Sequence, residues 1–194
     1  MEHPTPLELT EGLEEVLRSP HDEGPVMLIV RRQGAAARDV LPAATLDVTD
    51  GLVGDTWRTR GSRRTPDGLA DPKMQLTVMN ARAAALIAVE DERWKLAGDQ
   101  LYADLDLSEA NLPPGTRLAV GSAMIEVTDA PHLGCAKFQA RFGDDALRFV
   151  NSEVGRTLRL RGVNTLVVQG GRVALGDEIR KVGSPASGSV IPGL

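Results

Sequence analysis

The chain has 194 residues, of which 42% are hydrophobic and 25% charged, proportions typical of a folded globular protein. This length suits one well-buried domain, and we expect a single domain over residues 1–194. The formal charge of −5 offers no overall attraction for nucleic acid or an anionic membrane, so neither is expected as a partner.

The first 25 residues are predicted to form a leading helix and a linker. Apolar residues recur at helical spacing from Leu7 to Leu17, and Thr10 is a candidate N-cap for a helix that starts at Glu11. This acidic segment lacks the apolar stretch of a secretion signal, and apolar runs elsewhere are too short to cross a bilayer. A single cysteine cannot form an intrachain disulfide. We therefore expect a cytoplasmic protein.

From residue 26 to residue 182 the sequence changes to short β-prone runs separated by turn residues. Seven such runs occur, at residues 26–32, 41–49, 74–79, 116–121, 123–129, 161–169 and 172–182. Seven short strands in one domain predict a mainly β barrel or sandwich. The pairs Gly121-Ser122 and Gly170-Gly171 have the composition of two-residue turns, so each is predicted to close a hairpin.

Two further helices are expected among the strands. Asn80 is a candidate N-cap for a helix that starts at Ala81. Asp144 is a candidate N-cap for a second helix, and Gly155 indicates that this second helix ends near Ser152. The long segment 56–72 has no apolar periodicity, which is typical of a functional or mobile loop. The last residues, 183–194, are rich in Gly, Pro and Ser and are expected to form a flexible tail.

Cys135 is the only cysteine, and its neighbours allow two interpretations. His132, Lys137 and Arg141 are close to it in sequence, and positive neighbours favour a reactive thiolate. Gly134 indicates a turn that would aim the sulfur outward. An isolated cysteine is also a common small core residue. The local residues leave both interpretations open.

Other chemistry at these residues has less support. His132 and Cys135 are suitable zinc ligands, but the remaining histidines, His3 and His21, lie in the leading segment, so half of a structural zinc site is missing. A Cys-His hydrolase dyad lacks an accompanying oxyanion motif. A pyridoxal phosphate enzyme normally needs a larger chain, and Lys137 is not expected to be its Schiff-base lysine.

The segment 56–72 is rich in arginine, and guanidinium groups bind phosphate through bidentate hydrogen bonds. Four arginines, at Arg58, Arg60, Arg63 and Arg64, are therefore candidates to bind a phosphorylated ligand, the alternative being a solvated basic loop. Neither a Walker loop nor a dinucleotide fingerprint occurs, which argues against ATP or NAD as that ligand.

The order of several motifs identifies a family resemblance. The motifs are "GLVGD" at 51–55, "MQLTVMN" at 74–80, "AGDQL" at 97–101, "NLPPGTRLAVG" at 111–121, "IEVTDAPHLGCAKF" at 125–138 and "GVNTLVVQGGRVALGDEI" at 162–179. In this order they resemble the MOSC domain, which is named after the C-terminal domain of molybdenum cofactor sulfurase. The resemblance implies a mainly β (α+β in detail), closed barrel of the pyruvate kinase β-barrel type with a few peripheral helices.

The resemblance also implies the role of Cys135, which falls at the family's characteristic cysteine. That cysteine either binds the molybdenum of the molybdenum cofactor (molybdopterin) or carries sulfur as a persulfide. For the cofactor, the resemblance and the residue types together suggest roles for further residues: His132 and Lys137 beside the sulfur, the four arginines of segment 56–72 and Arg141 as cations, and Asp99 and Asn111 as pterin contacts. No pyridoxal phosphate is expected on this chain, because the fused sulfurase domain of some relatives is absent from it.

Three functions follow as hypotheses. The first is redox chemistry on a small substrate, for example an N-hydroxylated compound, with molybdenum on Cys135 and electrons from a donor protein. The second is a sulfur carrier that receives a persulfide on Cys135 from a cysteine desulfurase. The third is a domain that binds an anion or a protein and does no chemistry, which predicts a buried, unreactive Cys135. Two segments, 56–68 and 97–112, depart from the usual family pattern, so the substrate is not carried over.

Overall fold

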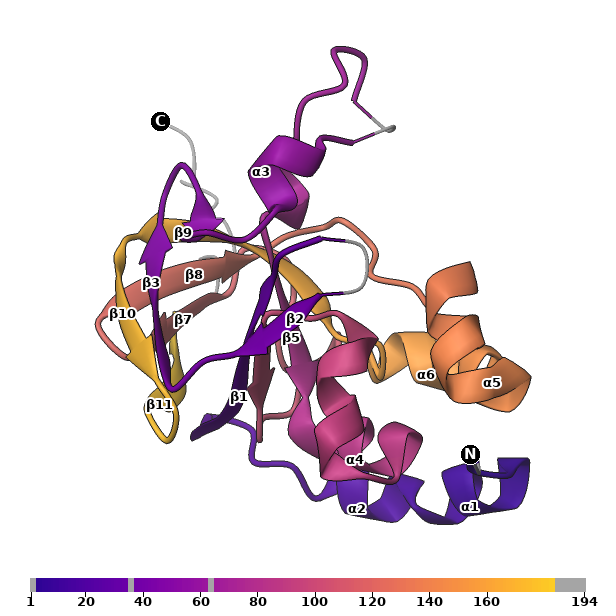
Figure 1. Ribbon diagram of the computed structural model, residues 1–194. Helices are drawn as coiled ribbons and strands as arrows, with labels where there is room; N and C mark the ends of the chain where they lie inside the picture. Colours follow the sequence, from indigo (N-terminus) through magenta and orange to yellow (C-terminus); the bar gives the residue numbers. More distant parts are fainter. Residues whose placement is uncertain (1–2, 35–36, 63–64, 184–194) are drawn as a thin grey trace, which may run out of the picture.

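The computed structural model describes residues 3–34, 37–62 and 65–183 (Figure 1). Its strands are β1 (Glu23–Arg32), β2 (Arg38–Val40), β3 (Ala43–Asp47), β4 (Gly51–Leu52), β5 (Leu76–Asn80), β6 (Leu101–Ala103), β7 (Arg117–Val120), β8 (Ala123–Val127), β9 (Val163–Gln169), β10 (Gly171–Ala174) and β11 (Glu178–Gly183). Its α-helices are α1 (Pro6–Glu11), α2 (Leu13–Leu17), α3 (Trp57–Arg60), α4 (Ala81–Ala88), α5 (Ala136–Asn151) and α6 (Glu153–Thr157), with 3₁₀ helices η1 (Pro72–Met74) and η2 (Asp91–Ala97).

Seven strands form a closed barrel in the order β11-β7-β8-β9-β5-β6-β1, and the pairing of β1 with β11 completes the ring. Six of the seven pairings are antiparallel, and β5 with β6 is parallel. Strand β2 pairs with β1 in antiparallel orientation. Strands β10, β3 and β4 form a separate small sheet. The mainly β, closed barrel with a few peripheral helices predicted above is therefore confirmed.

The barrel interior is apolar because alternate strand residues point inward. On β8 these are Ala123, Ile125 and Val127, all buried, while the residues between them are half-buried. On β1 the register shifts between Val26 and Leu28, and this bulge brings Val26 and Ile29 to the same interior although they lie three residues apart. Burial of each such side chain contributes about 1.5–3 kcal/mol to the hydrophobic driving force.

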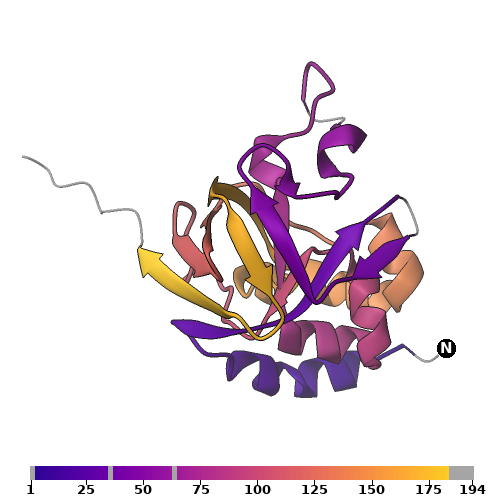
Figure 2. The same ribbon diagram turned by 60° about the vertical axis from the view of Figure 1, so that its left-hand side comes forward.

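A second apolar cluster lies between the barrel and the helices that pack outside it. It joins Val30 of β1, Met79 of β5 and Tyr102 of β6 to residues of α1, α2, α4 and α5. Helices α1, α2, α4, α5 and α6 lie on one side of the barrel, whereas α3 lies apart from them (Figure 1 and Figure 2). Strand β5 lies between the two apolar clusters: Leu76 and Val78 face the barrel interior, and Met79 faces the helices. All five of its residues are therefore buried.

The leading helix begins earlier than predicted. Thr5 accepts a hydrogen bond from the Glu8 amide while the Glu8 carboxylate accepts one from the Thr5 amide, a capping box that starts α1 at Pro6. The predicted cap, Thr10, instead donates its hydroxyl to the Pro6 carbonyl within α1. The predicted cap at Asn80 is confirmed, since its side chain accepts from the Ala83 amide at the start of α4.

The helix after Cys135 is also longer than predicted. Helix α5 starts at Ala136 and bends at Gly143, whose φ of 86° is left-handed, so the helical segment expected after Asp144 is its second part. The end expected near Ser152 is confirmed, because α5 ends at Asn151 and Ser152 caps α6.

One predicted hairpin is correct and the other is wrong. Gly121, with φ of 54°, and Ser122 connect β7 and β8 as expected. Gly170-Gly171 does not close a hairpin: β9 already pairs with β8 and β5, so the closed barrel leaves it no free edge, and β10 pairs with β3. A Cβ on Gly171 would lie 2.5 Å from the backbone of Ser122, so only glycine lets the chain cross there.

The predicted run 172–182 divides into β10 and β11. Within the described ranges, no helix is long and apolar enough to cross a membrane. The predicted tail falls almost entirely on residues 184–194, which lie outside the described residues.

Candidate functional site

A cavity of about 440 Å³ opens beside Cys135 at one end of the barrel. It is bounded by strand ends and by the segments that follow them. Its lining includes Arg32, Trp57, Arg60, His132, Cys135, Arg161 and Asn164. Its volume lies in the range of small-molecule sites, and three of these residues are cationic. We call it the Cys135 cavity.

Cys135 is exposed and unbridged, which rules out the core-residue interpretation in this structure. It is the N-cap residue of α5, with extended backbone (φ −125°, ψ 177°) and no side-chain cap hydrogen bond. The first-turn N–H groups of α5, whose first part ends at the kink at Gly143, lie next to the sulfur-bearing residue. This position favours negative charge at the cavity wall.

The residue before Cys135, Gly134, is held by hydrogen bonds to Asn151 at the C-terminal end of α5. The Gly134 amide donates to Asn151 Oδ1 at 2.9 Å, and Asn151 Nδ2 donates to the Gly134 carbonyl at 3.1 Å. A Cβ on Gly134 would lie 2.8 Å from Leu147 and 2.9 Å from Val150. The bend at Gly143 returns the second half of α5 toward Gly134, so the sulfur position depends on close packing that only glycine allows.

His132 lies on the same segment, and its side chain is 12% exposed. Its Nδ1 is 3.4 Å from Asn164 Oδ1, and Asn164 Nδ2 donates to the Ala130 carbonyl at 3.1 Å. Burial and the charge of Arg161 lower the pKa of His132 to about 4, against the opposing effect of Asp99. The imidazole is therefore neutral at pH 7.

Asp99 does not line the cavity but supports two residues that do. Its side chain is fully buried; Oδ2 accepts a hydrogen bond from Arg161 Nη1, and Oδ1 lies 3.3 Å from His132 Nε2. The second contact is close enough for an ion pair but is not aligned as a hydrogen bond, and Oδ1 has no hydrogen-bond partner among the described residues. Arg161 also donates to the Ala97 carbonyl, while its Nε, likewise buried, has no partner there.

Arg32 is oriented into the cavity by Asp55. The carboxylate accepts the Arg32 backbone amide at 2.8 Å, the Arg32 guanidinium through Nε and Nη2, and the Trp57 amide at 2.8 Å. Both charged side chains are buried, at 9% and 0% exposure. One carboxylate thus joins the end of β1 to the start of α3 and fixes two residues of the cavity wall.

The arginines predicted in segment 56–72 separate in the structure. Arg60 lines the cavity, makes no ion pair within the described ranges, and has its pKa lowered by burial and by the charge of Arg32. Arg58, on the same short helix, pairs with Asp50 at the surface instead. Arg63 and Arg64 lie outside the described residues.

The structure places three other predicted residues away from the cavity lining. Lys137 is exposed on the first turn of α5. Arg141 donates to the Leu96 carbonyl on η2. Asn111 donates to the carbonyls of His21 and Asp106 and accepts from Lys181, so its amide joins loop segments to β11.

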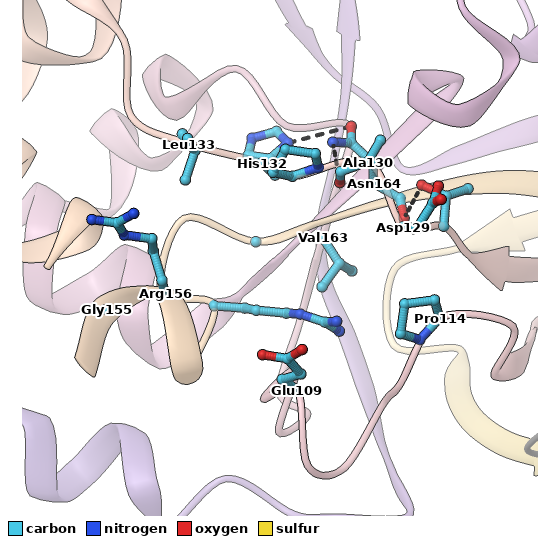
Figure 3. Close-up of a pocket in the computed structure, with 14 residues that line it drawn as sticks. Glu109, Pro114, Asp129, Ala130, His132, Leu133, Gly155, Arg156, Val163 and Asn164 are labelled. Atoms are coloured by element: carbon cyan, nitrogen blue, oxygen red, sulfur yellow. Dashed lines mark hydrogen bonds between the residues drawn. The ribbon is translucent and has the colours of Figure 1, made fainter. Parts of the chain in front are cut away.

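A second, smaller cavity of about 210 Å³ adjoins the first (Figure 3). Pro131, His132, Leu133 and Asn164 line both cavities and form the wall between them. Figure 3 shows His132 and Asn164 facing each other across the hydrogen-bond contact described above, with Glu109 on the far side of the cavity. Across residues 3–34, 37–62 and 65–183, no group of three or more His, Cys, Asp or Glu side chains is placed to hold a metal ion, so Cys135 and His132 do not complete a zinc site there.

Sequence reasoning missed Arg32, Asp55, Arg161 and Asn164. A signal existed for two of them: Asp55 ends the motif "GLVGD", and Asn164 is a polar residue inside the apolar run "GVNTLVV". The motif supports only the family resemblance and the run only a strand, so neither residue was identified. Nothing in the local sequence distinguishes Arg32 or Arg161 from the other arginines.

Comparison with known proteins gives the fold. No family model matches the sequence, and no curated protein matches it. Among solved structures, the YuaD protein from Bacillus subtilis is similar at TM-score 0.59 and 14% identity, over 81% of this chain and 94% of that one. YiiM from Escherichia coli is similar at TM-score 0.54 and 19% identity (84% and 71% covered), and YiiM from Geobacillus stearothermophilus at 0.54 and 14% (82% and 75%). These likenesses support a MOSC-like fold for this chain.

Proposed function

We propose that this chain is a member of the MOSC family and binds molybdenum cofactor in the Cys135 cavity. The observation that carries the proposal is the meeting of an exposed thiol with three arginines at one cavity of small-molecule size. The cofactor has two groups that a protein can bind: a metal that accepts a thiolate ligand, and a terminal phosphate. A site for it must therefore place sulfur and positive charge on the same wall.

The residues present fit such a ligand. Arg60 has no carboxylate partner within the described ranges, and the buried Nε of Arg161 has no hydrogen-bond acceptor there. A buried donor without an acceptor costs free energy, which an anionic ligand can recover. Arg32, by contrast, is already oriented by Asp55, so its place in the wall is set before a ligand arrives.

The chain's own residues would then have distinct roles. Cys135 Sγ would bind the metal, Arg60 and Arg161 would bind negative charge on the ligand, and His132, held between Asn164 and Asp99, would form part of the wall beside them. When bound, the cofactor would supply a molybdenum centre that exchanges electron pairs with a small substrate. For an N-hydroxylated substrate the balance is R–NHOH + 2e⁻ + 2H⁺ → R–NH₂ + H₂O: the N–O bond is reduced, and an electron-donor protein supplies the electrons.

The test measures molybdenum per chain after purification from a molybdenum-sufficient host. We expect stoichiometric molybdenum in the wild type, loss of at least about 90% in Cys135→Ser, and a marked reduction in Arg60→Ala. Arg58→Ala is the matched control, because Arg58 lies on the same helix but pairs with Asp50 outside the cavity. Near-zero molybdenum in both wild type and Cys135→Ser would overturn the proposal.

The exposure of Cys135 also favours a second candidate, a sulfur carrier. In this function a desulfurase persulfide transfers its outer sulfur: E–S–SH + Cys135–SH → E–SH + Cys135–S–SH. Incubation with a cysteine desulfurase and free cysteine, followed by mass spectrometry, would then add one sulfur (32 Da for S) that cyanide removes. A chain that retains only its free thiol in this assay, yet contains molybdenum, supports the first function over the second.

The third hypothesis, binding without chemistry, predicted a buried Cys135. The exposed position of this residue is contrary to that prediction.

A further inference from the structure

The imidazole of His132 lies between two oxygen atoms. Nδ1 is 3.4 Å from Asn164 Oδ1, and Nε2 is 3.3 Å from Asp99 Oδ1. The amide of Asn164 is oriented by its other contact, since Nδ2 donates to the Ala130 carbonyl and leaves Oδ1 toward the ring. Both groups that face the ring are thus hydrogen-bond acceptors.

A neutral imidazole has only one N–H to donate. If Nδ1–H donates to Asn164, the lone pair of Nε2 faces a carboxylate oxygen that is itself buried and without a hydrogen bond among the described residues. In this tautomer, Nε2 and Asp99 Oδ1 are two buried acceptors that face each other without a proton between them. A buried acceptor without a donor lowers the stability of the folded state. A proton on Nε2 would turn this contact into an ion pair between an imidazolium and a carboxylate, which does not require hydrogen-bond alignment.

The positive charge of the cavity wall opposes that proton. Burial lowers the pKa of His132 most, and the charges of Arg161 and Arg32 lower it further. On the side of the Cys135 cavity, the titratable and charged groups around this ring are Asp99 and Arg161, Arg32 with Asp55, Arg60, Asp71 and Cys135. On the side of the smaller cavity they are Glu109, Asp129, Arg156 and Arg159. Negative charge placed in the cavity would offset the guanidinium groups and favour protonation.

We propose that Asp99 and His132 form a buried proton-binding pair, which takes up one proton between Nε2 and Oδ1 when an anion occupies the Cys135 cavity. The proton comes from solvent, and the only bond formed is Nε2–H. The pair does not depend on which anion enters, so the inference is separate from the binding of molybdenum.

Proton uptake and anion binding must be reciprocal. Where the free pair is deprotonated and the occupied pair protonated, each pH unit of acidification strengthens anion binding by up to about tenfold. Sulfate is the suitable probe, because its own charge does not change between pH 4 and pH 8. Any pH dependence of its affinity then belongs to the protein.

The experiment is ¹⁵N NMR of histidine-labelled wild-type protein, titrated with acid in the absence and presence of sulfate. The chain has three histidines, so His132 is assigned with His132→Gln. We expect saturating sulfate to raise the pH at which His132 becomes protonated by about one pH unit or more. His21 is the internal control, because it is 71% exposed beside Asp106 and outside the cavity, and its titration should not respond to bound sulfate.

Two variants separate this proposal from general charge effects. Asp99→Asn keeps the size of the side chain but removes the carboxylate, so His132 should be protonated only at lower pH than in the wild type, and the shift caused by sulfate should be smaller. His132→Gln should bind sulfate with an affinity that varies at most about twofold between pH 4 and pH 7. Should Asp99→Asn not fold, His132→Gln provides the decisive comparison.

The proposal is overturned if His132 titrates at the same pH at the highest sulfate concentration as without sulfate, whether or not sulfate binds. It is also overturned if His132→Gln retains the pH dependence of the wild type. A protein that passes both tests and binds no molybdenum retains this inference and loses the proposed cofactor.

Discussion

Inside the barrel, side chains such as Leu118, Ile125 and Ile179 are fully buried and carry no polar group. Behind the wall of the Cys135 cavity, Asp55 and Asp99 are buried too, and the wall itself includes the charged side chains of Arg32, Arg60 and Arg161. Apolar burial stabilises the fold directly, whereas a buried ion pair gains little or nothing over an apolar pair of similar volume. The wall therefore contributes a place for negative charge more than it contributes stability.

The largest effect should come from breaking a charge pair in the wall. Asp55→Ala leaves the buried Arg32 guanidinium without its carboxylate and the Trp57 amide without an acceptor. We expect the free energy of unfolding, measured in urea, to fall by about 3–5 kcal/mol. Asp50→Ala, at a surface pair with Arg58, should change it by less than about 1 kcal/mol. Similar losses in both variants would show that the buried Arg32–Asp55 pair matters no more for stability than the surface Arg58–Asp50 pair.

In the barrel interior, Leu118→Ala should cost about 3 kcal/mol through lost burial and the void it leaves. The same urea measurement checks it, with Leu7→Ala, at a side chain 66% exposed, as the control that changes little. The folded variant should keep its sulfate affinity. A large loss of sulfate binding would mean that barrel and wall are coupled rather than separate.

The wall should also make stability depend on pH. The pKa of His132 is lowered to about 4 in the folded chain from 6.5, so between these values the unfolded state binds a proton that the folded state does not. The free energy of unfolding should thus fall as pH decreases from 6.5 to 4, by up to about 3 kcal/mol. His132→Gln should flatten this part of the profile. A wild-type profile that is level over this range would contradict the assignment.

A smaller effect is expected where a polar residue serves only the fold. Asn80→Ala removes the N-cap of α4 and the hydrogen bonds from its amide to Ser19 and the Leu105 carbonyl. We expect a loss of about 1–2 kcal/mol in thermal or urea unfolding, with no change in sulfate binding. Lost sulfate binding at full folding would show that Asn80 acts on the cavity.

The smallest stability effect should come from the residue most important for function. Cys135 is exposed, so Cys135→Ser should change the free energy of unfolding by less than about 0.5 kcal/mol. Circular dichroism with urea checks this, alongside the molybdenum measurement. Destabilisation by 2 kcal/mol or more would assign Cys135 a structural role instead.

Much of the barrel was predictable because its signals are local. The alternation in β8 and the turn at Gly121-Ser122 depend on adjacent residues. The turn expected at Gly170 failed for a non-local reason, since ring closure gives both edges of β9 to other strands. The three-residue strand β6 was missed because so short a segment shows no alternation pattern.

The candidate site was predictable only in part. Cys135 was found through the order of motifs, and Arg60 through the local density of arginine. Arg161 and Arg32 come from positions far apart in the chain and meet only after folding, so no spacing rule identifies them. Asp99 was identified, but its position behind His132 rather than at the ligand follows from tertiary packing alone.

The pairing of Glu23 with Arg180 joins the first strand of the barrel to the last. During synthesis on the ribosome, one edge of β1 must therefore wait until β11 has emerged before it finds its partner. Contacts at such long sequence separation slow folding, and an open strand edge favours association with other chains in the meantime. We expect the yield of folded protein to be most sensitive to temperature and chaperones during this interval, when most of the barrel has been translated and the ring is still open.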